Sequence, residues 1–333
     1  MNEQNTETGK GQSLQASPSP HLSNASFTTR GMMVDVLIAL APVIIMAVYM
    51  FRIYAVKQLV ICLISTLAAE AIFTKMRKKP LPLMDCSAAV TGLILGLSLP
   101  GPAPWYVGVI GSFVAIGIGK TIFGGLGMNI FNPAMVGRAF VMIAFAGSMA
   151  ASGFMEAAVT NVDVITQATP LDSFKQSGVI TPLMDLFLGT TNGSLGEISA
   201  VACLLGGIYL CIRRTASWEI PAAIIGTVIV LGGIANLVSP DSGWTVMHHL
   251  FGGALLFGAF YIATDPVTSP LTRSGKVIFG VGVGAMIMLL RIFSGYPEGV
   301  MFAVLMMNAL TPLLNRWTIP KPFGAIKEVP ATE

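Results

Sequence analysis

Long apolar runs recur along the chain, and they constrain its fold more than any other feature of the sequence. A membrane-spanning helix needs about 20 apolar residues. Ten segments approach that length: 32–51, 55–73, 86–99, 105–119, 134–151, 197–212, 220–238, 246–263, 277–293 and 299–317. Only 11% of the residues are charged, against about 25% in soluble proteins. The sequence therefore predicts an all-α polytopic membrane protein with about ten transmembrane helices, and it excludes an ordinary water-soluble enzyme.

Two of these segments are too short to cross a bilayer comfortably, and both end at helix-breaking residues. The segment 86–99 is followed by Pro100-Gly101-Pro102, and the segment that ends at Ala263 is followed by Asp265-Pro266. Proline removes a backbone donor and clashes with the preceding turn. Both segments are therefore expected to be broken or re-entrant helices.

The distribution of Lys and Arg predicts the orientation, because short cationic loops stay in the cytoplasm. With the N-terminus inside, fourteen cations fall on the cytoplasmic side and four (Arg52, Lys57, Lys175 and Arg291) on the outer side, with Arg138 inside a span. Both termini are thus expected in the cytoplasm. We expect a disordered cytoplasmic tail over 1–28, helices over 29–151, an extracytoplasmic loop over 152–196, helices over 197–317, and a cytoplasmic tail over 318–333.

The two halves of the chain share short blocks in the same order, which suggests a duplication. In the first block, Gly92, Ser98, Pro100 and Pro104 match Gly258, Thr264, Pro266 and Pro270 at a constant offset. In the second, Gly119-Lys120 matches Gly275-Lys276, and Met128-Asn129 matches Met307-Asn308. Because five spans per half is an odd number, the copies would form two inverted five-helix repeats, with a site between them at the broken helices. Alternatively, Gly and Pro only permit close packing and kinks.

Several classes of chemistry lack support in the sequence. A net charge of +3 without a basic stripe gives no nucleic-acid surface, and there is no Walker A or dinucleotide fingerprint. The neighbours His248 and His249 point to different faces of a helix, so no shared metal is expected. The four cysteines lack metal-ligand spacing and are interpreted as small buried hydrophobes.

Ionisable residues inside spans are functional candidates because they are costly in hydrocarbon. Asp35, Glu70 and Arg138 qualify. Asp35 and Glu70 are expected near the cytoplasmic ends of their helices, where water reaches them, either in an ion path or in a plain interfacial role. Arg138 follows Asn129 and Asn132 closely, so the three are expected to form one site for a phosphate or a polarised ring. The alternative for Arg138 is a structural salt bridge.

The long outer loop offers one residue suited to covalent modification. Thr169 follows the small residue Ala168, and Pro170 restricts the chain after it. A modifying enzyme could esterify this hydroxyl. By itself, such a stretch is an ordinary surface loop.

The order of four motifs resembles a known family. These are Ser19-Pro20-His21, then Asn129-Ile-Phe-Asn132-Pro133-Ala134 with Val136-Gly137-Arg138, then Thr166-Gln-Ala-Thr169, and finally Ala263-Thr264-Asp265-Pro266. Together they resemble the D subunit of Rnf electron-transport complexes and the homologous B subunit of sodium-pumping NADH:quinone oxidoreductase. The resemblance covers nearly the whole chain.

That resemblance implies an FMN esterified to Thr169 by a flavin transferase, within a motif that also contains Asp163, Thr166 and Ala168; Gln167 replaces the usual glycine. It implies a bacterial or archaeal cytoplasmic membrane complex that couples electron transfer between ferredoxin and NAD⁺ to Na⁺ or H⁺ translocation, with other Rnf subunits handling ferredoxin and NAD⁺. A second, noncovalent flavin such as riboflavin is a further expectation.

The ion path is expected to include Asp35, Glu70, Ser98, Thr264 and Asp265. The competing interpretation is a channel or secondary transporter, of the inverted-repeat type found in ammonium and urea channels, without a redox role.

Overall fold

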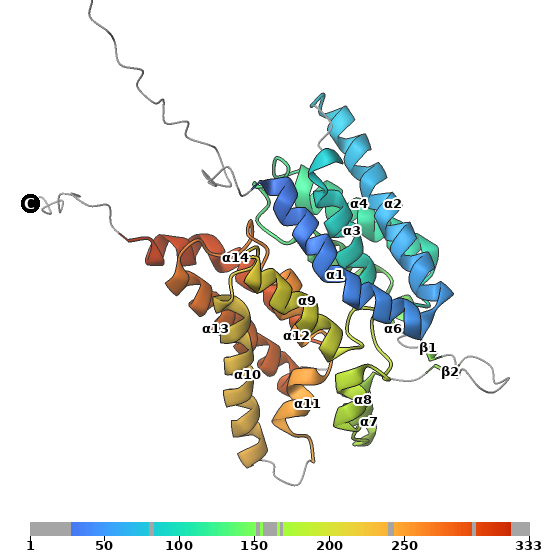
Figure 1. The fold of residues 1–333 in the computed structure, drawn as a ribbon, viewed down its shortest axis with the longest axis vertical. Coiled ribbons are helices and arrows are strands. Elements are labelled where there is room, and N and C mark those ends of the chain that lie inside the picture. The colour runs from blue at the N-terminus through green and yellow to red at the C-terminus, as the bar shows by residue number, and fades with distance from the viewer. Residues whose placement is uncertain are drawn as a thin grey trace, which may run out of the picture.

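The computed structural model describes residues 28–79, 83–150, 154–155, 165–166, 169–238, 243–294 and 298–320, and most of these residues are helical. The helices form a single bundle in Figure 1. The N-terminal end of α1 (Thr29–Phe51) and the C-terminal end of α14 (Val300–Thr318) lie toward the upper left of this view. By contrast, α7 (Pro170–Ser177) and α8 (Leu183–Leu188) lie at its lower end. The segment that carries Thr169 is therefore at the opposite end of the bundle from both of these helix ends.

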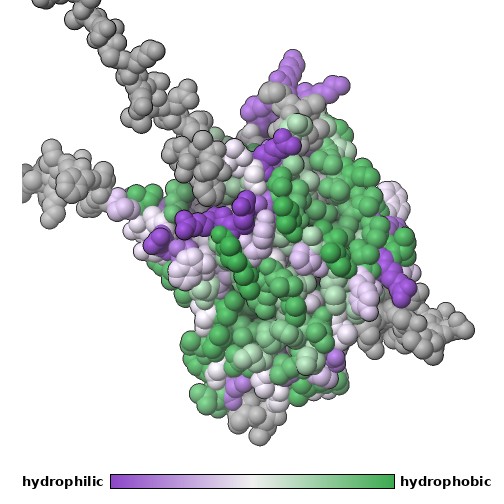
Figure 2. Space-filling view, in the orientation of Figure 1, coloured by the Kyte–Doolittle hydropathy of each residue, from purple (hydrophilic) through white to green (hydrophobic). Residues whose placement is uncertain are grey.

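Four helices of the described chain are long and apolar enough to cross a membrane: α1, α2 (Ile53–Met76), α10 (Glu219–Val238) and α13 (Arg273–Phe293). Their outward faces carry large exposed hydrophobic side chains, such as Ile45, Leu237 and Phe293. Figure 2 shows hydrophobic surface along the sides of the bundle, with much of the hydrophilic surface toward its upper end. Because water would not tolerate such a surface, the structure confirms an all-α polytopic membrane protein.

Of the remaining predicted spans, α14 is a continuous helix of 19 residues with Pro312 inside it, and the others are shorter or interrupted. They comprise α3 (Ser87–Ser98), α4 (Trp105–Ile116) continued by the π-helical turn η2 (Gly117–Thr121), α5 (Pro133–Ala144) followed by α6 (Ala146–Ala150), and α9 (Ala200–Ile212). The predicted segment 246–263 consists of α11 (Val246–Phe251), α12 (Leu255–Phe257) and the π-helical turn η4 (Gly258–Ile262). Its helix is interrupted at Gly252 and Gly253, the latter with a φ of +71°, and not only at the predicted Asp265-Pro266. A positive φ is readily adopted only by glycine.

The described part of the predicted outer loop returns into the bundle. Within the loop, β1 (Phe154–Met155) and β2 (Ile165–Thr166) form an antiparallel pair. Outside it, a short helix η1 (Leu83–Asp85) precedes α3. After α8, the backbone N–H of Gly196 donates to the carbonyl of Leu97 at 2.7 Å, and that of Leu195 donates to Leu99 at 3.2 Å. The loop therefore places Ser194 and Glu197 beside the end of α3.

The helices of the two halves pack on one another in matching pairs. In the first half α2 packs on α4 and α4 on α5; in the second, α10 packs on α13 and α13 on α14. Glycines allow the close contacts of α4 with α2 and of α13 with α10. A Cβ on Gly108 of α4 would lie 3.1 Å from the side chain of Gln58, and a Cβ on Gly280 of α13 would lie 2.8 Å from the carbonyl oxygen of Ile220. Between the halves, α1 packs on α9 and α5 on α14.

Only the first of the two matched sequence blocks occupies equivalent places. Ser98 ends α3 and donates to the carbonyl of Leu95, while Thr264 follows η4 and donates to that of Phe260. The second block does not correspond, because Lys120 lies at the end of the fourth span and Lys276 in the first turn of the ninth. Short matches among Gly, Lys and apolar residues arise by chance in a chain of this composition.

Candidate functional site

Thr169 begins α7, and its hydroxyl is held by a residue one turn later. Its Oγ1 donates to Oδ2 of Asp172 at 2.9 Å and accepts from the Asp172 backbone N–H at 3.3 Å. Only 8% of Thr169 is exposed. Pro170 suits the first helical position, where its missing N–H costs nothing. Asp163 and Ala168 lie outside the described residues, and Thr166 is the second residue of β2.

Contacts with the second half of the chain fix α7 in place. The ring of Phe174 stacks on Trp244, with centroids 4.3 Å apart. Lys175 donates to the carbonyl of Ser294 at 2.7 Å, and Leu171 is buried. The position of Thr169 is therefore set by packing against residues that follow α10 and α13.

The charges around α7 shift the ionisation of two of its residues. Burial raises the pKa of Asp172, as does the negative charge of Glu298, while the Thr169 hydroxyl and Lys175 oppose the rise. Burial lowers the pKa of Lys175, and Arg291 lowers it further against the effect of Asp172. The environment of Thr169 thus contains three charged neighbours besides Asp172.

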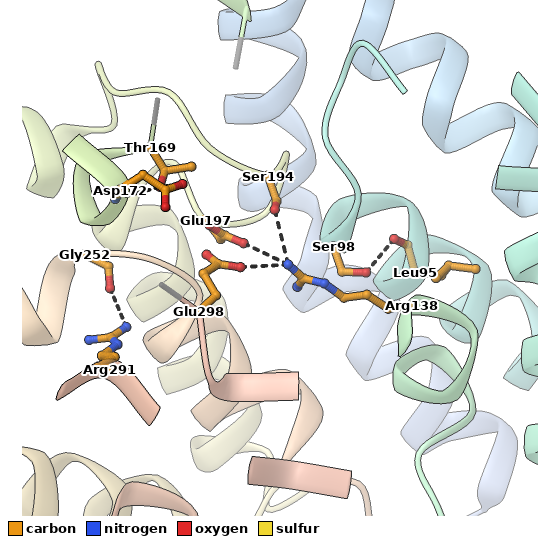
Figure 3. Close-up of polar contacts among 10 residues, drawn as sticks. All are labelled: Leu95, Ser98, Arg138, Thr169, Asp172, Ser194, Glu197, Gly252, Arg291 and Glu298. Carbon is orange, nitrogen blue, oxygen red and sulfur yellow. Dashed lines mark hydrogen bonds and ion pairs between the residues drawn. The ribbon is translucent and has the colours of Figure 1, made fainter. Parts of the chain in front are cut away.

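A buried cluster of charges lies next to this segment, and Arg138 of α5 is at its centre. Its Nη2 lies 2.7 Å from Oε2 of Glu298 and 3.5 Å from both Oε1 of Glu197 and Oγ of Ser194. Figure 3 shows Arg138 reaching toward the two glutamates, with Thr169 and Asp172 on their other side. Arg138 is only 7% exposed. The salt-bridge alternative for Arg138 is therefore realised, and a role toward a cofactor is compatible with it.

Arg291 of α13 is a second buried cation at this end, although the sequence suggested an ordinary outer charge. It is 3% exposed, and it donates to the carbonyl oxygens of His249 and Gly252. Those carbonyls end the interrupted helix α11 and would otherwise lack partners. The favourable interaction of a cation with a helix C-terminus explains this placement.

The cluster has hydrogen-bonding capacity to spare. Glu298 Oε1, Arg138 Nε and Arg291 Nε are buried and have no partner among the described residues. A buried polar atom without a partner is costly, so such atoms fit a site that receives a polar group. Within the described residues, the cluster therefore has two donors and one acceptor free to bind a further polar group.

Asn129 and Asn132 do not join Arg138, contrary to the expected common site. Asn132 caps α5 by accepting from the backbone N–H groups of Ala134 and Met135, and its Nδ2 donates to the carbonyl of Ile262 at 3.4 Å. Both asparagines line a cavity of about 70 Å³ that Arg138 does not reach. The reason is geometric, because six helical residues advance by about 9 Å.

This cavity lies between the two halves and contains further predicted residues. Thr264 and Asp265 line it, as does Lys120. Asp265 accepts from the backbone N–H of Val267 at 3.3 Å and from the Thr268 hydroxyl at 3.1 Å. Ser98, the last residue of α3, is not among the lining residues. The predicted ion-path residues therefore fall in more than one place.

Asp35 and Glu70 each pair with a cation of another segment. Asp35 accepts from Thr215 at 2.9 Å and from Arg213 at 3.3 Å. Glu70 forms a buried ion pair with Lys120, whose Nζ also donates to Ser87 at 2.6 Å. The expectation that water reaches both carboxylates is therefore wrong for Glu70, which its helix turns toward a buried cation of another segment. The Asp35 side chain remains 12% exposed, and its partner Arg213 is 57% exposed.

Sequence reasoning missed Glu197, Glu298 and the burial of Arg291. Glu197 is the first residue of a predicted span and Glu298 lies just before another, and an isolated charge at such a position looks like a loop residue. One sequence signal could have indicated them. Because charges inside the membrane tend to pair, an acidic residue next to an apolar segment is a candidate partner for each cation inside a span.

Comparisons with known proteins agree with this architecture. Residues 15–324 match the model of the NQR2, RnfD, RnfE family. The chain is 41% identical to the D subunit of the Na⁺-translocating ferredoxin:NAD⁺ oxidoreductase complex of Acetobacterium woodii, over 94% of this chain and 96% of the relative. It is 39% identical to the D subunit of the proton-translocating ferredoxin:NAD⁺ oxidoreductase complex of Clostridium ljungdahlii, over 92% and 95%. It is also 38% identical to the D subunit of the ion-translocating oxidoreductase complex of Halorhodospira halophila, over 92% and 94%. The chain belongs to the NQR2, RnfD, RnfE family.

Proposed function

We propose that this chain is the D subunit of an Rnf-type complex and carries an FMN esterified to Thr169, which relays electrons while the complex moves Na⁺ or H⁺. The observation that carries the proposal is the position of the Thr169 hydroxyl. It lies at the start of α7, at the opposite end of the bundle from the start of α1 and the end of α14. With those ends in the cytoplasm, the cofactor would be tethered on the outer face of the cytoplasmic membrane.

The residues around Thr169 have the chemistry to hold such a group. A bound flavin would supply the redox chemistry, and the protein would set its position and electrostatics. Arg138 and Arg291 each keep a buried Nε without a partner among the described residues. Lys175 lies one turn beyond Asp172 and interacts with it. These three cations would balance a phosphoester placed beside Asp172 and Glu298.

Ion translocation requires a path, for which the interrupted helices remain the best candidates. Ser98 and Thr264 mark the ends of α3 and η4 in the two halves, and Asp265 lies next to Thr264. The identity of the ion stays open in this proposal, because relatives named for Na⁺ and for protons are 41% and 39% identical to the chain.

The proposed partners follow from the names of the relatives. Ferredoxin and NAD⁺ would react at other Rnf subunits, and a flavin transferase would load Thr169. A second, noncovalent flavin such as riboflavin remains a prediction, as do the assignments of Asp163, Thr166 and Ala168 to the attachment motif.

Intact mass tests the attachment site. The wild-type subunit, purified from cells that contain the transferase, should carry one added FMN mass and fluoresce after denaturing electrophoresis. Thr169→Ala should have the bare chain mass and no fluorescence, whereas Thr169→Ser should keep both. Thr190→Ala in the same loop is the control, because Thr190 also donates its hydroxyl to an aspartate at 2.9 Å. Fluorescence in Thr169→Ala equal to that of the wild type would refute the site.

A further inference from the structure

The Thr169 hydroxyl is hydrogen-bonded to the side chain of the third residue of α7. In α11 of the same chain, Thr245 also contacts the third helical residue: its backbone N–H lies 3.1 Å and its hydroxyl 2.8 Å from Nδ1 of His248, an imidazole in place of a carboxylate. In α7, the carboxylate at the equivalent position accepts from the Thr169 hydroxyl at 2.9 Å. Asp172 therefore contacts the proton that leaves when this hydroxyl is esterified.

The neighbours of Asp172 favour a carboxylate that can accept a proton. Glu298 faces it from the segment before α14, and Lys175 faces it from the next turn of α7. Arg291 of α13 interacts electrostatically with both Lys175 and Glu298. Glu298 also interacts with Glu197, and Arg138 of α5 forms ion pairs with both glutamates. In the packed state, burial and Glu298 raise the pKa of Asp172 above its ordinary value of 3.8. Because the hydroxyl is reached before α7 packs, the role of Asp172 as a base rests on its local hydrogen bond to the hydroxyl and not on this shift.

We propose that Asp172 is the general base for the esterification of Thr169. This inference rests on the proposed function. Esterification needs a phosphate with a leaving group, which the pyrophosphate of a flavin adenine dinucleotide provides. Oγ1 of Thr169 forms a bond to the flavin-side phosphorus, and the bond from that phosphorus to the AMP oxygen breaks. AMP leaves with the bonding electron pair, and the hydroxyl proton passes to Asp172 and then to water.

The burial of Thr169 is consistent with this role. A transferase must reach the hydroxyl before α7 packs against Trp244 and Ser294, because Thr169 is only 8% exposed in the packed state. Asp172 is three residues away within the first turn of α7. Its contact with the hydroxyl is local, so it moves together with the segment when α7 is undocked.

The test measures flavin transfer, not activity of the loaded complex. The full-length subunit from cells lacking the transferase is purified in detergent and mixed with a flavin transferase, FAD and Mg²⁺, and covalent fluorescence is followed over time. Asp172→Asn should lower the initial rate about 100-fold, in line with the 10²–10⁴ of general base catalysis. Asp172→Glu should restore most of that loss. Asp185→Asn is the matched control, because Asp185 accepts from Thr190 at 2.9 Å in the same loop; its rate should equal that of the wild type.

Two further measurements separate a base from a residue that only stabilises α7. The wild-type rate should fall as the pH drops through the pKa of Asp172, and this limb should be absent in Asp172→Asn. Formate should accelerate transfer to Asp172→Ala, because it supplies an external carboxylate, but not to Asp185→Ala. A wild-type rate and pH profile in Asp172→Asn would overturn the inference, as would a loss that is independent of pH and not rescued by formate. Labelling of Thr169→Ala would instead overturn the proposed function.

Discussion

Replacing Arg138 by Leu should destabilise the folded chain strongly, because two buried carboxylates depend on one guanidinium nitrogen. Glu298 and Glu197 lie 2.7 and 3.5 Å from Nη2, so these two carboxylate oxygens are no more than about 6 Å apart. Burial and the neighbouring Glu298 raise the pKa of Glu197 well above its ordinary value, so Glu298 is the carboxylate that depends most on Arg138. Removing one partner of a buried ion pair typically costs about 3–5 kcal/mol. We therefore expect a loss of about 3–5 kcal/mol in the free energy of unfolding.

Unfolding by SDS in mixed micelles, followed by far-ultraviolet circular dichroism, measures this loss. Arg273→Leu is the control, because Arg273 is paired with Glu219 at 3.6 Å while its side chain is 92% exposed; it should cost less than about 1 kcal/mol. Adding Glu197→Gln and Glu298→Gln to Arg138→Leu should recover most of the loss, since the unpaired charges are then gone. Mild acid should have the same effect by protonating the carboxylates. A cost for Arg138→Leu no larger than that of Arg273→Leu would refute the reasoning.

Two further predictions concern packing inside the first half. Lys120→Leu should cost about 3–5 kcal/mol in the same assay, because it leaves Glu70 buried without its cation; the double variant with Glu70→Gln should be more stable than Lys120→Leu, and additive losses would contradict the pairing. Gly137→Val should prevent α5 from packing on α4, because a Cβ there lies 2.5 Å from the carbonyl oxygen of Gly111. Monodisperse protein on size-exclusion chromatography should be lost for Gly137→Val but kept for Gly147→Ala, where nothing lies within 4 Å; equal yields would contradict the close contact.

The spans could be predicted from the sequence because hydropathy is a local property. The predicted 32–51 and 220–238 correspond to α1 (Thr29–Phe51) and α10 (Glu219–Val238) within three residues at each end. The short third span was also predictable, because Pro100 and Pro102 follow it directly. The break at Gly252 and Gly253 was not, since glycine is common in membrane helices and only the backbone conformation distinguishes a break from a packing contact.

The buried ion pairs could not be predicted, because their partners are remote in the chain. Arg138 and Glu298 are separated by 160 residues, and Lys120 and Glu70 by 50. Neither hydropathy nor helical spacing relates residues so far apart. Proximity in the sequence also led to the wrong expectation that Asn132 and Arg138 share a site. Asn132 caps the start of α5, while Arg138 reaches the charged cluster near Thr169.

α5 connects the two regions that the proposed function has to couple. At its start, Asn132 lines the cavity between the halves and donates to the carbonyl of Ile262 in η4. Further along, Arg138 binds Glu197 and Glu298 beside the Thr169 segment. Coupling between redox state and ion occupancy is a reciprocal free energy between two sites, and it requires an element that contacts both. Because helices are rigid along their axis, a change of charge that shifts Arg138 would also shift Asn132. Both contacts of α5 reach residues of the second half, so such a shift would act directly on the interface between the halves.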